Sequence, residues 1–193
     1  DAEVVFDMEG KNEDMFFLSN GHISPVWYSV LARKGYFPVA ELATFRKIDS
    51  RLQDHPTTHE GLPGVRIASG SLGQGMSVAL GAAFSKRLDK DDKLVYVLMG
   101  DGEQQEGQVW EAAMFAPHHQ IGQLIAFIDL NGQQIDGPTI KVMNNRDLGE
   151  KYKAFGWEVM HIEHGNDMAA VVKGITEARG KAGHGKPVMV LLE

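Results

Sequence analysis

The chain contains no cysteine among its 193 residues. This absence excludes a disulfide scaffold, a thiolate nucleophile and a cysteine-ligated metal. Positive charge is also scarce, because 19 Lys and Arg face 26 Asp and Glu, for a formal net charge of −7. A nucleic-acid surface needs a basic patch, so we expect no nucleic-acid partner. Since no apolar run approaches a membrane span and no signal peptide opens the chain, we expect a cytoplasmic protein without a membrane partner.

Short apolar runs alternate with segments of helical spacing along the whole chain. This alternation predicts an α/β fold with a doubly wound, mostly parallel sheet and helices on both faces. The length and the 43% apolar content fit a single domain over residues 1–193. The predicted strands are 95–99, 124–129, 158–162 and 188–192. The predicted helices are 25–31, 40–52, 75–88, 103–116, 147–155 and 167–180. Two long segments are predicted to be loops, 53–75 and 132–145.

Two polar residues follow neighbouring predicted strands. Asp101 lies between two glycines after the first strand, and Asn131 follows the second. Because open α/β sheets bind ligands at the carboxyl ends of their strands, we expect both side chains at one site. A small set of oxygen ligands suits Mg²⁺, and the flanking glycines let a phosphate approach the backbone.

Ordered motifs surround this pair and carry a family resemblance. They are Leu18–His22, His55–Pro56, Leu62–Val65, Gly70–Gly75, Gly100–Gly107, Trp110–Ala112 and Asp129–Gly137. Together they resemble the diphosphate-binding domain of transketolases, a thiamine-diphosphate-binding fold. A single Gly-Asp-Gly would be a weak signal, but several motifs in the right order are specific. Ser71 departs from many transketolases, which have proline there.

The resemblance implies thiamine diphosphate and Mg²⁺ (or Ca²⁺) as cofactors. It makes the Asp101 carboxylate, the Asn131 side chain and the Gln133 backbone carbonyl the metal ligands. It also implies that His22 and His55 line the cofactor and the substrate. The remaining positions that match cofactor contacts are Gly102 at the diphosphate, Gly70 and Leu72 beside the aminopyrimidine, and Ile135 at the thiazolium.

The resemblance further implies an activity that requires a second domain. Transketolases transfer a two-carbon ketol unit between sugar phosphates, as in the pentose phosphate pathway, and their pyrimidine-binding domain supplies an activating glutamate. Glu106, and less clearly Glu111, match residues that approach this glutamate. We expect the domain to be incomplete at both ends and to work with a pyrimidine-binding subunit in a homodimer or a heterotetramer. The motif Gln104–Glu111 favours a split transketolase.

Three alternatives stay open at the level of the sequence. Another thiamine-diphosphate enzyme, such as deoxyxylulose-phosphate synthase or a 2-oxo acid dehydrogenase E1 subunit, shares much of the pattern. A non-catalytic module that binds only a diphosphate or a partner would keep the same motifs. A dinucleotide-binding domain is the third alternative, although the glycines of Gly70–Gly75 have the wrong order for its fingerprint.

Overall fold

The computed structural model describes residues 4–193 and is built around a five-stranded parallel sheet. The strand order is β1-β2-β3-β7-β6, so the predicted α/β class with a parallel sheet is confirmed. The strands are β1 (Met15–Leu18), β2 (Val95–Gly100), β3 (Leu124–Asp129), β6 (Glu158–Ile162) and β7 (Val188–Leu192). A two-stranded antiparallel hairpin, β4 (Gln133–Gln134) and β5 (Gly137–Pro138), follows β3.

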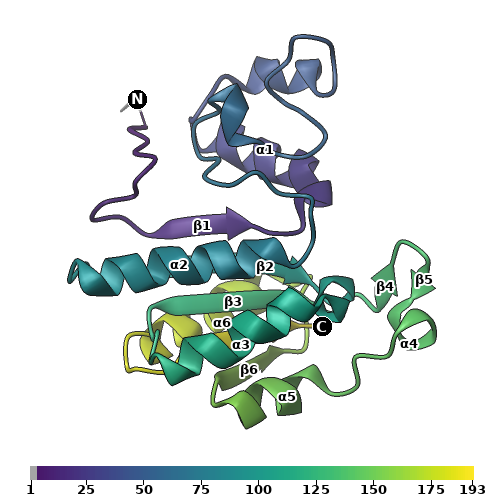
Figure 1. Ribbon diagram of the computed structural model, residues 1–193. Helices are drawn as coiled ribbons and strands as arrows, with labels where there is room; N and C mark the ends of the chain where they lie inside the picture. The colour runs from purple at the N-terminus through teal and green to yellow at the C-terminus, as the bar shows by residue number, and fades with distance from the viewer. Residues whose placement is uncertain (1–3) are drawn as a thin grey trace.

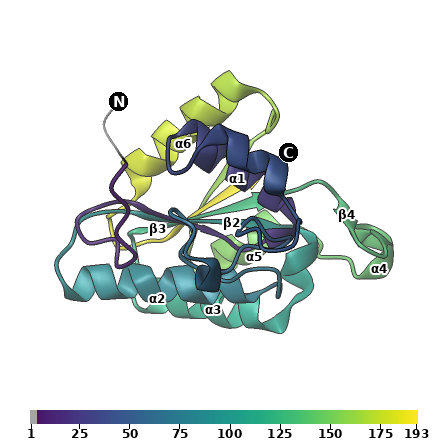
Figure 2. The ribbon, with the colours of Figure 1, turned by 90° about the horizontal axis from the view of Figure 1, so that it is seen from above.

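Helices cover both faces of the sheet, with α2 and α3 on one side and α6 on the other (Figure 2). The α-helices are α1 (Ser24–Arg33), α2 (Gln74–Leu88), α3 (Gly107–His118), α4 (Thr139–Val142), α5 (Leu148–Phe155) and α6 (Met168–Lys181). Four 3-10 helices complete the structure: η1 (Gly21–Ile23), η2 (Val39–Thr44), η3 (Thr58–Glu60) and η4 (Gly102–Gln105).

Alternate residues of the central strands feed two separate cores. Val97 of β2 and Ala126 of β3 pack with α2, α3 and α5, whereas Ile125 and Phe127 pack with α6. This two-sided burial explains why β3 is a continuous apolar run in the sequence. A third cluster around Tyr28 joins α1 to the segments that follow it.

All five strands point the same way, so their carboxyl ends share one edge of the sheet. The hairpin β4–β5 and the short helix α4 project beyond that edge (Figure 1). Ligand sites of open α/β sheets lie at this edge. Within residues 4–193, no helix has the length and apolar character needed to cross a membrane.

Three local predictions are wrong. Met15–Leu18 forms the edge strand β1, which is absent from the predicted strands. The helix predicted over 40–52 is only the short η2, because Arg46 and Asp49 adopt left-handed φ angles of 60° and 62° that end any helix. The helix predicted over 103–116 is interrupted at Glu106, whose backbone is extended between η4 and α3.

Candidate functional site

Asp101 follows β2 directly and is almost fully buried, with 5% of its surface exposed. One carboxylate oxygen accepts the Gly102 amide at 2.9 Å, and the other accepts the Gly132 amide at 3.0 Å and the Thr139 hydroxyl at 3.4 Å. Burial raises the pKa of the Asp101 carboxyl, although the two backbone amides oppose that rise. The carboxylate therefore joins the end of β2 to the loop that follows β3.

Asn131 lies on that neighbouring strand end, next to Asp101, because Gly100 and Asp129 are paired in the sheet. The Asn131 amide nitrogen donates to the Asp129 carboxylate at 2.9 Å, and its side-chain oxygen accepts the Gln133 amide at 2.9 Å. An amide oxygen has two lone pairs. The side chain is thus oriented by its neighbours while one lone pair is left for a metal ion.

Gly102 lies against the segment that carries Gln133 and Gln134. A Cβ atom at Gly102 would lie 2.7 Å from the Cβ of Gln134 and 3.4 Å from the Gln133 carbonyl oxygen. This carbonyl therefore faces the turn that carries Asp101, and the three predicted metal ligands gather at the ends of β2 and β3. One carboxylate with two neutral oxygens is a donor set that fits Mg²⁺. Among residues 4–193, no three His, Cys, Asp or Glu side chains form a metal-binding group of their own.

The predicted histidines lie at a second cluster, around Gly70. The φ angle of Gly70 is +121°, and a Cβ atom there would lie 2.7 Å from Cδ2 of His55. A Cβ atom at Gly21 would lie 2.8 Å from the Gly70 amide nitrogen. Gly70 therefore lies against both His55 and Gly21, the residue before the exposed His22, although these residues come from separate segments of the sequence.

Glu106, Leu72 and Ile135 form the solvent-facing part of the predicted site. Glu106 packs over Gly73, where an added Cβ atom would lie 2.7 Å from the Cβ of Glu106. Leu72 is 37% exposed, and Ile135 at the tip of the β4–β5 hairpin is 99% exposed. Both apolar side chains are therefore exposed in this structure.

Sequence reasoning missed the buried Glu103, which is 1% exposed. Its carboxylate accepts hydrogen bonds from Ser19 and from the backbone of Gly73 and Gly100. It also missed Asn145, whose side chain donates to the Asp101 carbonyl at 2.6 Å. An acidic residue at the start of a helix usually faces solvent, so the position of Glu103 in the sequence carried no signal of burial.

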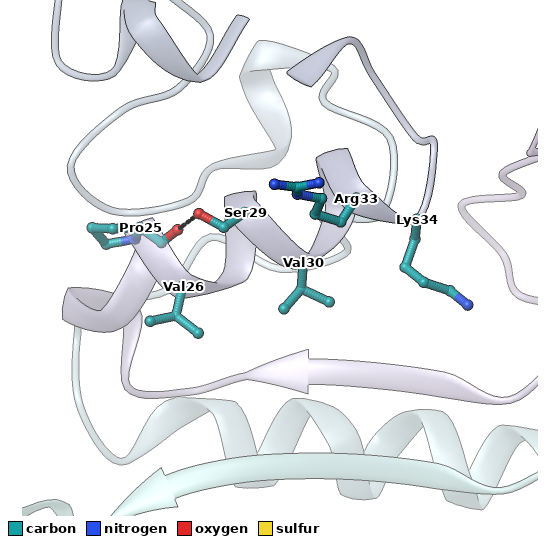
Figure 3. A pocket seen from close by; sticks show the side chains of 6 residues that line it. All are labelled: Pro25, Val26, Ser29, Val30, Arg33 and Lys34. Atoms are coloured by element: carbon teal, nitrogen blue, oxygen red, sulfur yellow. Dashed lines mark hydrogen bonds between the residues drawn. The ribbon is translucent and has the colours of Figure 1, made fainter. Parts of the chain in front are cut away.

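A separate hollow lies along α1 and contains none of the predicted site residues. Figure 3 shows Val26 and Val30 pointing toward β1, with Arg33 and Lys34 at one end. The Ser29 hydroxyl donates to the Pro25 carbonyl at 2.7 Å within the helix itself. The hollow thus combines an aliphatic wall with two cationic side chains, and it lies apart from the predicted site at the strand ends.

Comparison with known proteins identifies the family. The model of the transketolase thiamine diphosphate binding domain matches residues 6–193. The chain belongs to this transketolase family. The predicted family is thereby confirmed, and thiamine diphosphate is the ligand for which the family is named.

Two relatives of this transketolase domain are named as subunits. The 6-deoxy-6-sulfo-D-fructose transketolase subunit SqwG of Clostridium sp. (strain MSTE9) is 41% identical over 179 residues, covering 93% of this chain and 64% of the relative. An apulose-4-phosphate transketolase subunit from Phocaeicola vulgatus is 38% identical over 160 residues, covering 83% of this chain and 56% of the relative. The chain thus spans less than two thirds of the length of either relative.

Solved transketolases share the fold. A transketolase variant from Pichia stipitis superimposes with a TM-score of 0.87 at 34% identity, covering 96% of this chain and 29% of that one. Transketolase from Leishmania mexicana gives a TM-score of 0.86 at 32% identity, with the same coverage of 96% and 29%. The parallel sheet described above is therefore the transketolase diphosphate-binding fold, and it forms under a third of these longer chains.

Asn131→Ala is expected to weaken Mg²⁺-dependent binding of thiamine diphosphate by roughly tenfold, because it removes a neutral ligand without removing charge. The side chain is exposed, so the thermal stability of the domain should stay close to that of the wild type. Isothermal calorimetry at saturating Mg²⁺ measures the change. Asn144→Ala, an exposed asparagine outside the predicted ligand set, serves as the control, and equal affinities of the two variants would contradict a ligand role for Asn131.

Proposed function

We propose that this chain is the diphosphate-binding part of a transketolase that uses Mg²⁺ and thiamine diphosphate. With a pyrimidine-binding partner it would transfer a two-carbon ketol unit from a ketose phosphate to an aldose phosphate. We infer that residues 1–193 act as one diphosphate-binding domain in the cytoplasm. Symmetric assembly is the common outcome for such units, so we propose a homodimer or a heterotetramer.

The observation that carries this proposal is the arrangement around Asp101. A buried carboxylate at the end of β2 is held by amides from two glycines, and the Gln133 carbonyl faces the same turn. Asp101, Asn131 and Gln133 would hold Mg²⁺, and the metal and the Gly102 amide would hold the diphosphate. Because the chain has a net charge of −7, we propose that a metal ion, backbone amides and a few histidines hold the anionic cofactor at this edge.

The residues of the second cluster would act on the rings and on the substrate. Thiamine diphosphate supplies the carbon nucleophile and electron sink for C–C cleavage, while the protein supplies orientation and electrostatics. Gly70 and Leu72 would pack beside the aminopyrimidine, and Ile135 beside the thiazolium. His22 and His55 would hydrogen-bond sugar hydroxyls and transfer protons, because a neutral imidazole has one donor nitrogen and one acceptor nitrogen.

The names of the relatives favour a partner on a separate chain. Both are called subunits, one for 6-deoxy-6-sulfo-D-fructose and one for apulose 4-phosphate. The named ketoses differ, while the predicted diphosphate site is retained in this chain. One of these names carries a sulfo group and the other a phosphate, so our proposal of a ketose phosphate donor rests on the family resemblance. The identity of the ketose would be read by residues outside the metal site.

A calorimetric titration tests the cofactor assignment directly. Thiamine diphosphate should bind in the presence of Mg²⁺ and lose most of its affinity when EDTA is added. NAD is the comparison ligand, because a dinucleotide-binding domain would favour it. Binding of NAD in place of thiamine diphosphate would refute the proposal.

Glu106→Gln is expected to lower ketol transfer by about 100-fold in the presence of the partner, the usual scale for a group that takes part in proton transfer. Cofactor affinity should change less than about threefold, because the side chain is exposed and packs over Gly73 outside the metal-ligand set. Steady-state kinetics and calorimetry on the same preparation separate the two effects. Glu150→Gln, on the exposed face of α5, is the matched control, and a Glu106 variant with wild-type turnover would exclude the role.

A further inference from the structure

Glu103 is a buried carboxylate that has no cationic partner within ion-pair distance in the described part of the chain. A buried charge is costly unless hydrogen bonds satisfy it. Hydrogen bonds from the Ser19 hydroxyl and from the Gly73 and Gly100 amides offset this cost. The fold thus keeps an acidic side chain in its interior at a site where an apolar one would pack at lower cost.

The three donors come from three different segments. The Ser19 hydroxyl lies just beyond β1, the Gly73 amide donates at 2.8 Å from the turn before α2, and the Gly100 amide donates at 3.3 Å from the end of β2. Each segment carries predicted cofactor residues next to the donor. His22 follows Ser19 by three residues, Leu72 precedes Gly73, and Asp101 follows Gly100.

The packing around this carboxylate leaves little room for adjustment. A Cβ atom at Gly75 would lie between 2.3 and 2.7 Å from the Oγ, Cβ and Cα atoms of Ser19. The left-handed Gly73, with a φ angle of +87°, lies against Glu106. The β1 end and the start of α2 are therefore in direct contact, and the Glu103 carboxylate joins both to the metal-binding end of β2.

We propose that Glu103 is a positioning residue that sets the distance between the metal–diphosphate half of the site and the half around His22 and Leu72. This inference rests on the proposed function. The carboxylate suits the task because it is an acceptor only and meets three donors. A glutamine at this position would present an NH₂ group to at least one backbone amide, and the mismatch would loosen one of the segments.

Two ligands of different length distinguish a positioning role of Glu103 from a general effect of the substitution on the stability of the domain. Mg²⁺–pyrophosphate needs only the Asp101 end, whereas Mg²⁺–thiamine diphosphate needs both halves. In the full chain, Ser19→Ala should weaken thiamine diphosphate at least fivefold and Mg²⁺–pyrophosphate less than about twofold, because it releases only the β1 end. Glu103→Gln should weaken thiamine diphosphate by about tenfold or more, and the double variant should lose no more than Glu103→Gln alone.

Ser50→Ala is the matched control, since it removes a buried hydroxyl that accepts the Leu52 amide at 3.1 Å in the cluster around α1. It should leave both affinities unchanged. Equal weakening of the two ligands, additive losses, or wild-type binding by Ser19→Ala would overturn the inference. If Glu103→Gln does not fold, Ser19→Ala alone decides the question. A wild-type chain that binds neither ligand would instead overturn the proposed function, and this inference with it.

Discussion

Asp101→Ala is expected to abolish Mg²⁺-dependent binding of thiamine diphosphate, with a loss of affinity above about 100-fold. Asp101 is the only carboxylate in the predicted ligand set, and even changes in the surroundings of metal ligands commonly cost 10- to about 100-fold. Its oxygens also hold the Gly102 and Gly132 amides. Calorimetry with and without EDTA measures the loss.

The fold should survive this change at a moderate cost. Removal of the carboxylate leaves two amides without their acceptor, at a cost of up to about 1–3 kcal/mol for each. Asp101→Asn keeps the shape and one acceptor oxygen, so it should be more stable than Asp101→Ala while still binding Mg²⁺ weakly. Asp167→Ala is the control, because it also removes a carboxylate that accepts a backbone amide. The Asp167 carboxylate accepts the Ala170 amide at 2.7 Å and so caps the start of α6. A folded Asp101→Ala protein with wild-type affinity would contradict the metal assignment.

The chain by itself is expected to show no ketol transfer above background, and a pyrimidine-binding partner should restore turnover by at least about 100-fold. Cofactor activation needs an acid at the pyrimidine ring, and such groups contribute 10² to about 10⁴ in rate. Ile135 and Leu72 stand uncovered at the edge of the site, where a partner could enclose the cofactor.

The assay compares the chain, the candidate partner and their mixture, with a ketose phosphate donor and an aldose phosphate acceptor. Mixing the partner with the Asp101→Ala variant is the negative control. Turnover by the purified chain alone would show that the partner is unnecessary. A mixture that binds thiamine diphosphate tightly and never cleaves a ketose would favour a non-catalytic diphosphate-binding module.

The centre of the fold could be predicted because its strands are buried on both faces. β2 and β3 appear in the sequence as uninterrupted apolar runs, and their neighbouring positions bring Asp101 and Asn131 to one edge. The order of the motifs added the proposed metal and diphosphate positions, which stay predictions. The positions of Asp101 and Asn131 depend on two adjacent strand ends and on short turns, and the local sequence pattern predicts both of these features well.

Contacts between distant segments could not be predicted in this way. The approach of Gly21 to Gly70 and the burial of Glu103 depend on how the segments after β1 and before α2 meet. β1 itself has only four residues, too few to show a period. The false helix over 40–52 shows the opposite error, since its apolar spacing is suitable but left-handed residues such as Arg46 break it.

The position of β7 has a consequence for how the chain acquires its structure. β7 is the last strand in sequence order, yet it lies between β3 and β6 in the sheet. During synthesis, β6 therefore emerges before β7, its one neighbour in the sheet, while β1, β2 and β3 can already associate. Such non-local parallel pairing is slow to form and exposes an unpaired strand edge in the meantime. A chain that ends before Val188 and has been released from the ribosome should have a protease-sensitive α5–α6 region attached to a protected β1–β3 unit.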